Sequence, residues 1–246
     1  MLAGCGSHRQ AAKTNLPPPP SAPSSADRQP GTATAPAETT DKPSPAVHPG
    51  APASGKEIVV PADAKSLFTE TGLASWYGPH YNKRPGANGE VYDMDAMTAA
   101  HRTIPLNSTV RVTNIKTSQS VLLRITDRGP FVSDRIIDLS KAAAQKLDVY
   151  RAGTAMVKVE VLESPVPLLQ GGRWCVQIGG FRDTQDAAKL KNNLMRRYHT
   201  AQVLQFRSPV GEDWLRIRVA DDDKQRAESL MKETHTDAGM YLVRLD

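Results

Sequence analysis

TVRVTNIKTSQSVLLRITD, at residues 109–127, is the stretch that decides the fold class. Its first seven residues alternate apolar and polar side chains with a period of two, which is typical of a half-buried β-strand. KTSQ, at 116–119, is a polar turn, and the run at 121–127 is apolar and rich in β-branched residues. The stretch therefore predicts two consecutive strands, the second of which ends on Asp127.

The sequence on either side of this pair repeats the pattern. Further short strands are predicted at 72–78, 96–101, 134–140 and 156–162. KAAAQKL, at 141–147, carries Ala and Leu at helical spacing and predicts a short helix with Ser140 as its N-cap. Six short strands and one helix in about 95 residues predict a small β-barrel.

A different hydrophobic pattern, with both strand and helix periods, follows a Pro-rich break near 164–172. The apolar spacing predicts a strand, a helix, two strands, a helix and a final strand, at 173–181, 183–198, 201–206, 213–220, 223–234 and 240–245. The order β-α-β-β-α-β is that of a ferredoxin-like split βαβ unit. The folded part of the chain is therefore predicted to be mainly β followed by α+β.

The first part of the chain has a different composition. Most of the 19 prolines of the whole chain lie before residue 62, among Ala, Ser and Thr. Such a segment buries too little apolar surface to offset the entropy of ordering, so residues 6–64 are predicted to be a disordered tether. LAGC, at 2–5, resembles a bacterial lipobox and predicts lipidation of Cys5. No charged or apolar leader precedes it in this sequence, so a chance match is the alternative.

Charge and cysteine content exclude some classes of function. The net charge of +5 is scattered without a dense Lys/Arg run, so it does not favour nucleic acid as a partner. The histidines are dispersed and no Cys/His cluster has ligand spacing, so no metal is expected. Cys175 lies in an apolar strand and is expected to be a small packed residue.

Titratable side chains gather in GEVYDMDAMTAAH, at 89–101, and in TDRGP, at 126–130. Glu90, Asp93, Asp95 and His101 are close in sequence, and Asp127 follows at a strand-to-turn junction. Several such groups around one cleft are what general acid/base chemistry requires. Asp95 is expected to be a solvated charge.

GLASWYG, NGEVYDMDAMTAAH, TIPLNSTVRVTN, RITDRGPF and RIIDLSKAAAQKL together resemble the double-psi β-barrel of the rare lipoprotein A family. WCVQIGGF and the tail that it opens are similar to a SPOR domain, a module that binds peptidoglycan strands lacking stem peptides. ADDDKQ stands where such domains often carry a Gly-Pro turn. The resulting division is a signal remnant at 1–5, the tether at 6–64, a catalytic double-psi barrel at 65–163, a linker at 164–171 and a SPOR domain at 172–246.

The resemblance implies a septal lytic transglycosylase, an endolytic enzyme without a cofactor. It would cleave MurNAc-GlcNAc bonds in peptide-free glycan and leave 1,6-anhydro ends. It would be held by a lipid in the outer membrane, facing the periplasm, with divisome proteins as partners. Two alternatives remain open: a barrel that binds or loosens the cell wall without turnover, and a division-site scaffold.

The resemblance also places Glu90, His101 and Asp127 in the active cleft, with Asp93 beside them. Asp127 is the leading acid/base candidate because it ends a strand and is rigidly held. Glu90, on a Gly-Asn loop, is the rival for that role. His101 is expected to orient a carboxylate or to stabilise developing charge, and the alternative is a satisfied core histidine. Asp93 is expected to tune the others by like-charge repulsion.

Three neighbours of these groups are expected to contact substrate. Arg128 is predicted to pair with a carboxylate of the cleft, and the alternative is that it binds a sugar acid. Trp76 and Tyr77 are predicted to form a sugar-stacking wall, since aromatic faces suit pyranose rings. The alternative for Trp76 is the core of the barrel.

Strand alternation predicts a binding face in the tail. Leu215 and Ile217 point toward the helices, so Trp214, Arg216 and Arg218 share the other face, with Gln177 on the first strand. An aromatic ring, two arginines and an amide on an open sheet face predict a glycan-binding surface. RNA-binding domains use such a face for base stacking, but an RNP-type aromatic pair is missing here. A solvated sheet face is the remaining alternative.

Overall fold

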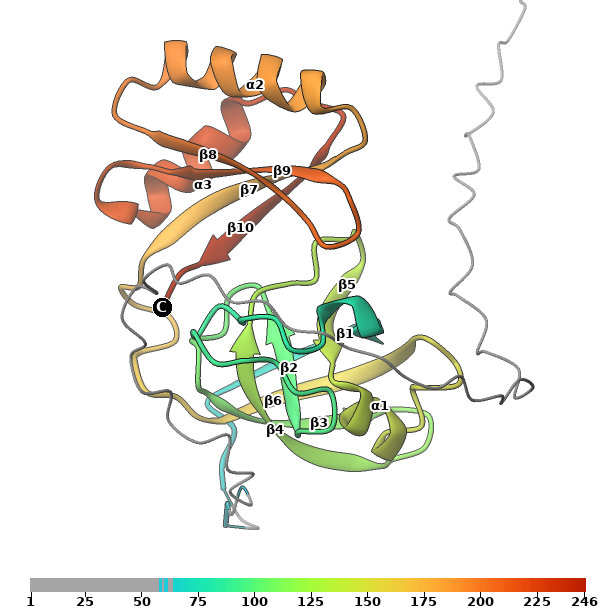
Figure 1. Cartoon of the computed structure of the whole chain (residues 1–246). Coiled ribbons are helices and arrows are strands. Elements are labelled where there is room, and N and C mark those ends of the chain that lie inside the picture. The colour runs from blue at the N-terminus through green and yellow to red at the C-terminus, as the bar shows by residue number, and fades with distance from the viewer. Residues whose placement is uncertain (1–57, 59, 62–63) are drawn as a thin grey trace, which may run out of the picture. The chain divides into compact units, whose positions relative to one another are not determined.

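Figure 1 shows a computed structural model of the chain, which describes residues 58, 60–61 and 64–246. Cys5 and nearly all of the predicted tether lie outside the described residues. Within the part of the chain that is described, no helix combines the length and apolarity needed to cross a membrane.

The first domain is a closed barrel of six strands in the order β1-β5-β2-β4-β3-β6, which confirms the predicted barrel. Parallel pairing of β1 with β5 and of β2 with β4 is mixed with antiparallel pairing elsewhere. The elements are β1 (Phe68–Trp76), η1 (Pro79–Tyr81), β2 (Thr98–His101), β3 (Thr109–Asn114), β4 (Ser120–Asp127), β5 (Arg135–Leu139), α1 (Lys141–Lys146) and β6 (Ala155–Glu163).

Alternation along the strands fills the interior of this barrel. Val110 and Val112 on β3 and Leu123 and Ile125 on β4 are fully buried in one apolar cluster. Each such side chain contributes roughly 1.5–3 kcal/mol through burial. Helix α1 begins as predicted, because Ser140 Oγ accepts the N–H of Ala143 at 3.2 Å.

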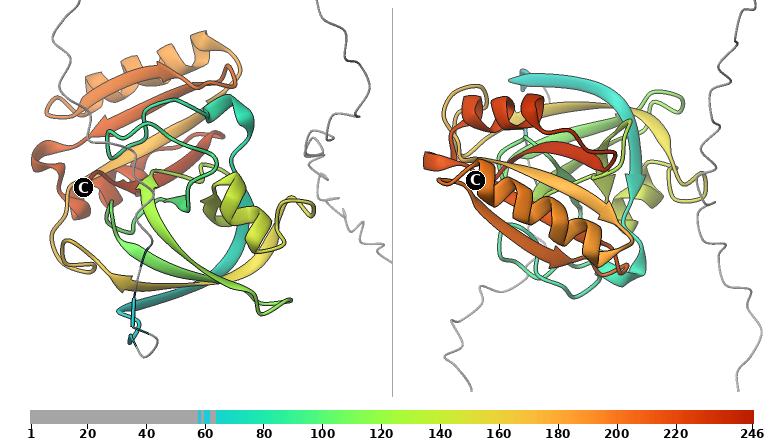
Figure 2. Two further views of the ribbon diagram at one scale, coloured as in Figure 1. Left: turned by 60° about the horizontal axis from the view of Figure 1, so that its bottom comes forward. Right: turned by 90° about the horizontal axis from the view of Figure 1, so that it is seen from above.

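The second domain is a four-stranded sheet in the order β10-β7-β9-β8, with two helices. Its elements are β7 (Trp174–Phe181), α2 (Thr184–Arg197), β8 (Gln202–Arg207), β9 (Asp213–Arg218), η2 (Ala220–Asp222), α3 (Lys224–Glu233) and β10 (Gly239–Arg244). The element order confirms the predicted βαββαβ unit. Apolar residues of α2 and α3 pack on Val176, Ile178, Leu215 and Ile217, so both helices cover the same face of the sheet (Figure 2).

The ADDDKQ segment enters α3 through an unusual backbone. Asp221 and Asp222 both have positive φ, 61° and 50°, a region that glycine adopts freely and other residues adopt only uncommonly. Buried Asp222 is held by Arg218 at 2.6 Å and by Arg173 at 2.9 Å. These ion pairs stabilise a turn that a glycine would form without strain.

Candidate active site

Four side chains form a row across adjacent barrel strands. Ser75 on β1 is paired in register with Asp138 on β5, Asp138 with Ala100 on β2, and Ala100 with Asp127 on β4. Residues that are paired across strands point to the same face of a sheet. Two carboxyl groups therefore flank the small methyl group of Ala100, on the face opposite the core.

An irregular pairing between β2 and β4 places Asp127 in this row. Ala99 pairs with Ile125, and Ala100 pairs with Asp127, so Thr126 is an extra residue in β4. Without this bulge, Asp127 would share the core face with Ile125, since a one-residue shift exchanges the two faces of a strand. The bulge thus turns a carboxylate away from the core and toward Ala100.

Asp127 is held by three donors. Its Oδ1 accepts the backbone N–H groups of Ala87 at 3.0 Å and Arg128 at 2.8 Å, and its Oδ2 accepts the hydroxyl of Tyr77 at 3.2 Å. Burial raises the pKa of Asp127 above its ordinary value, although these hydrogen bonds act in the opposite direction. Such a carboxyl is rigidly placed and retains its proton to a higher pH than an exposed aspartate.

Asp138 is a member of the site that the sequence reasoning missed. Its side chain is buried, and its Oδ1 accepts the hydroxyl of Ser75 at 2.5 Å. Burial raises the pKa of Asp138, with a smaller contribution in the same direction from Asp127, while Arg135 and Ser75 lower it. The available signal was an acidic residue in the middle of the apolar strand RIIDL.

Tyr77, which was predicted to stack on sugar, lies beside the two carboxyl groups. Its hydroxyl bonds Asp127, and burial followed by the charges of Asp127 and Asp138 raises its pKa well above the ordinary value. Its ring packs against Tyr81 and Tyr92, with centroids 5.5 Å and 5.1 Å away. The ring is therefore fixed within an aromatic group.

Glu90 lies outside this arrangement. Its carboxylate forms two hydrogen bonds with the guanidinium of Arg124, at 2.8 Å and 2.5 Å. The hydrogen bonds from Arg124 lower the pKa of Glu90, the opposite of what a general acid needs. The pKa of Glu90 is therefore shifted in the opposite direction from that of Asp127.

His101 was expected beside these acids, but it lies on the other face of β2. It pairs with Ile137 of the core face, one residue beyond Ala100. Its Nε2 is 3.1 Å from Glu70 Oε2, and its Nδ1 accepts the N–H groups of Thr103 and Ile104. Both ring nitrogens are thus occupied, and the carboxylate that His101 orients is Glu70.

Three other expectations also change. Asp93 is exposed and accepts the N–H of Asp95 at 2.9 Å, so it shapes a turn. Arg128 makes no ion pair with a site carboxylate, because its Nη1 donates to the carbonyl oxygens of His101 and Ile104. Trp76 packs against the barrel core and Tyr150, which is the alternative named for it.

The predicted face of the tail exists, but part of it is buried. Gln177 pairs with Arg216, and Trp214 lies over Gly179, where an added Cβ would be 2.4 Å from the indole. Gln177 and Trp214 are 2% and 6% exposed, so the prediction of an open face is wrong for these two side chains. Arg218 is engaged by Asp222 through two hydrogen bonds.

The accessible part of this face lies at β8. Leu204 and Phe206 are paired with Arg216 and Trp214, and they are 55% and 36% exposed. The guanidinium of Arg216 lies 5.4 Å from the centre of the Phe206 ring. Alternation in QVLQF was the signal for Leu204 and Phe206, which the sequence reasoning did not use.

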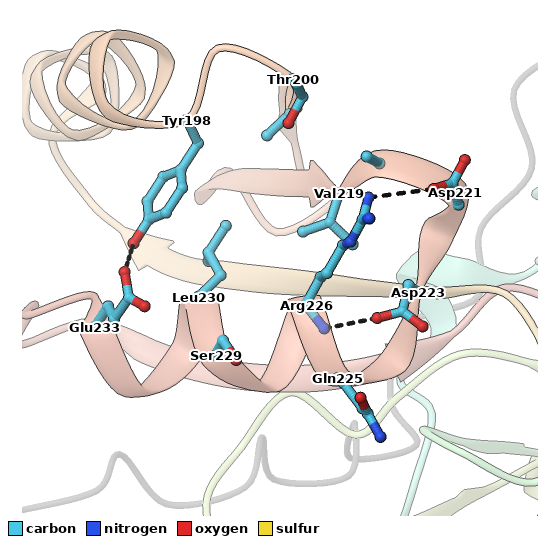
Figure 3. Close-up of a pocket in the computed structure, with 12 residues that line it drawn as sticks. Tyr198, Thr200, Val219, Asp221, Asp223, Gln225, Arg226, Ser229, Leu230 and Glu233 are labelled. Carbon is cyan, nitrogen blue, oxygen red and sulfur yellow. Dashed lines mark hydrogen bonds and ion pairs between the residues drawn. The ribbon is translucent and has the colours of Figure 1, made fainter.

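A cavity of about 700 Å³ lies elsewhere in the second domain, beside α3 (Figure 3). Its floor includes Val219 and Leu230, and its carboxylates have partners within the chain. Asp221 pairs with Arg226 at 3.2 Å, and Glu233 accepts the hydroxyl of Tyr198 at 2.8 Å. The cavity contains none of the expected glycan-binding residues. Among the described residues, no group of three His, Cys, Asp or Glu side chains is arranged to hold a metal ion.

Comparison with known families assigns a class to each domain. Residues 69–159 match the family described as lytic transglycolase, and residues 170–242 match the SPOR domain. The chain is 56% identical over 100 residues to the endolytic peptidoglycan transglycosylase RlpA of Neisseria meningitidis, covering 41% of this chain and 42% of that protein. Proteins of the same name from Campylobacter jejuni and Pseudomonas aeruginosa are 38% and 50% identical, over 54% and 48% of this chain. The matches span 55% and 34–35% of those two relatives, so the chain aligns with about half their length or less.

Proposed function

We propose that this chain, as a member of the rare lipoprotein A family, is a lytic transglycosylase of peptidoglycan. Its substrate would be glycan strands without stem peptides, cut between N-acetylmuramic acid and N-acetylglucosamine. The observation that carries the proposal is the pair of carboxyl groups, half-buried Asp127 and buried Asp138, on either side of Ala100. The pKa of each is raised by burial, which equips the pair to hold a proton at a pH where exposed aspartates are ionised.

Asp127 would act first as acid and then as base. Its proton passes to the glycosidic oxygen as the bond from that oxygen to muramyl C1 breaks, and the leaving sugar departs as an alcohol. The resulting Asp127 carboxylate then takes the proton of the muramyl C6 hydroxyl while the oxygen of that hydroxyl attacks C1. The product is a 1,6-anhydro end, and Asp127 regains its proton. Because the attacking hydroxyl belongs to the substrate, no second carboxylate is needed to activate water.

Asp138 would assist through its charge and its position. It is less accessible than Asp127 and is bonded to Ser75, so it is poorly placed to touch the leaving oxygen. A carboxylate on the same face favours a protonated neighbour by like-charge repulsion. Glu90 is not assigned a proton-transfer role here, because its ion pair with Arg124 favours the charged form.

The second domain would bind the glycan strand and concentrate the barrel on its substrate. Leu204, Phe206 and half-buried Arg216 form the accessible part of the predicted sheet face, where an apolar ring and a cation suit a sugar with an acidic group. The family resemblance further supports a lipid anchor on Cys5, attachment to the outer membrane and action at the division septum.

Mass spectrometry of glycan products tests the proposal. Residues 65–246 are incubated with amidase-stripped strands beside the Asp127→Asn and Glu90→Gln variants. We expect anhydromuramyl ends from the parent chain and from the Glu90 variant, and a loss of about 10²-fold or more for the Asp127 variant. Reducing ends would identify a hydrolase. Intact strands that co-sediment with the protein would favour the non-catalytic binding module.

A further inference from the structure

We infer that Tyr77 is a positioning residue whose hydroxyl assigns the transferable proton to Oδ2 of Asp127. The inference rests on the proposed function, which gives Asp127 the role of acid and base. It concerns which of two oxygens does the chemistry and what fixes that choice. The argument comes from the unequal surroundings of the two carboxyl oxygens.

Oδ1 of Asp127 is unfavourable for a proton, because two N–H donors already point at it. It accepts two backbone N–H groups, from Ala87 at 3.0 Å and from Arg128 at 2.8 Å. Backbone N–H groups cannot reverse their direction, so a hydrogen on Oδ1 would face two donors. The proton therefore belongs on Oδ2, whose protein partner is the Tyr77 hydroxyl at 3.2 Å.

The hydroxyl of Tyr77 suits both protonation states of this oxygen. It donates to the carboxylate, and by rotating about the C–O bond it accepts from the carboxylic acid. Burial and the nearby charges of Asp127 and Asp138 raise the pKa of Tyr77 well above its ordinary value, so the hydroxyl keeps its own proton. The hydroxyl can thus reorient as Oδ2 gains or loses its proton, without being deprotonated itself.

The position of the hydroxyl is fixed by the rest of the residue. The backbone N–H of Tyr77 donates to the carbonyl oxygen of Leu139 at 2.9 Å, which ties the residue to the end of β5. The ring packs against Tyr81 and Tyr92. This packing leaves the hydroxyl directed at Oδ2.

Five titratable or charged side chains lie near Asp127. They are Tyr77, Tyr81, Tyr92, Asp138 and Arg128. Of these side chains, Tyr77 is the one that donates a hydrogen bond to the Asp127 carboxylate. Removing its hydroxyl should therefore change the proton affinity of Oδ2 while the aromatic packing stays in place.

Tyr77→Phe in the full chain tests the inference. The hydrogen bond from Tyr77 lowers the pKa of Asp127, so its loss raises that pKa. We expect the alkaline limb of the kcat profile to move to higher pH and kcat at the optimum to fall about tenfold. KM should stay within about twofold, because the ring remains. Tyr81→Phe is the matched control, and its pH profile should be that of the parent chain.

A second readout separates this inference from the proposed function. The carboxyl carbon of Asp127, assigned by comparison with Asp127→Asn, is titrated by carbon-13 NMR in the parent chain and in Tyr77→Phe. A higher pKa in the variant supports the inference even if the chain cleaves no glycan, an outcome that would refute the proposed function alone. An unchanged Asp127 titration in a folded Tyr77→Phe protein would overturn the inference.

Discussion

Replacing Asp138 by asparagine should stabilise the protein at neutral pH and slow its chemistry. The residue Asp138 is 8% exposed, and burial raises the pKa of its carboxyl above the ordinary value. Ser75 at 2.5 Å and Arg135 at 3.7 Å offset part of this effect but do not reverse it. An amide keeps the shape of the group and can still accept the Ser75 hydroxyl, so the substitution removes mainly a buried charge.

The sign of the pH dependence follows from proton binding. Between the pKa of Asp138 in the unfolded chain and its raised folded value, the folded state binds more protons than the unfolded state. Stability from this group therefore falls as pH rises through that window, and the full penalty is present above the folded pKa. The parent chain carries this penalty at neutral pH, and Asp138→Asn does not.

Urea unfolding at about pH 7 and about pH 4 measures the effect. Removing the buried charge stabilises the folded state, and part of this gain is offset because Arg135 loses a partner. We expect Asp138→Asn to gain about 1 kcal/mol in the free energy of unfolding near neutrality, with the gain shrinking on acidification. A variant that is less stable at neutral pH would refute the reasoning, since the carboxylate would then be a net stabilising partner of Arg135.

The same substitution should shift the pH profile of the reaction. Asp127 and Asp138 interact as like charges, so removing the charge of Asp138 lowers the pKa of Asp127. The alkaline limb should then move to lower pH, opposite in direction to the change expected for Tyr77→Phe. Two shifts in the same direction would mean that the two variants perturb the site in a common way, such as loss of packing.

Two further predictions concern the residues that the structure moves away from the acids. Glu90→Gln should cost under about 1 kcal/mol of unfolding free energy, because its ion pair with Arg124 is exposed. The rate of anhydromuramyl release should change less than about threefold. A loss of about a hundredfold in that assay would restore Glu90 as the acid. Burial lowers the pKa of His101 in the folded state below its value of about 6.5 in the unfolded chain, so the unfolded state binds more protons between the two values. The parent chain should therefore lose stability as pH falls through this window. His101→Asn should remove this loss in urea unfolding at about pH 7.5 and about pH 5.5, and equal pH slopes in the two proteins would contradict it.

The sequence predicted the elements well because their signals are local. Alternation in TVRVTNI and in the neighbouring strands follows directly from the two faces of a β-strand, and Ser140 before KAAAQKL is a cap within one turn of its helix. The order of strands and helices in the second domain was predicted for the same reason. Each of these features depends on residues that are close together in the chain.

The candidate site was predicted less completely because it depends on register between distant segments. The extra residue at Thr126 decides the face on which Asp127 lies, and no feature of RITD reveals it. The pairing of His101 with Ile137 then assigns the histidine to the core face, although it is adjacent in sequence to Ala100. Nearness to an acid-rich motif was therefore a poor guide to which side chains meet.

Burial separates acids that look equivalent in the sequence. Glu90 and Asp93 stand in the conspicuous motif, yet both are exposed and occupied by local contacts. Asp138 sits inconspicuously between Ile137 and Leu139 in the sequence, yet its carboxyl group is buried on the opposite face of the strand, and this burial raises its pKa. Burial of an acid away from water provides the low-dielectric surroundings that raise the pKa of a proton donor. The search for an acid in such a barrel should therefore begin with carboxyl groups inside apolar strands, and then with polar loops.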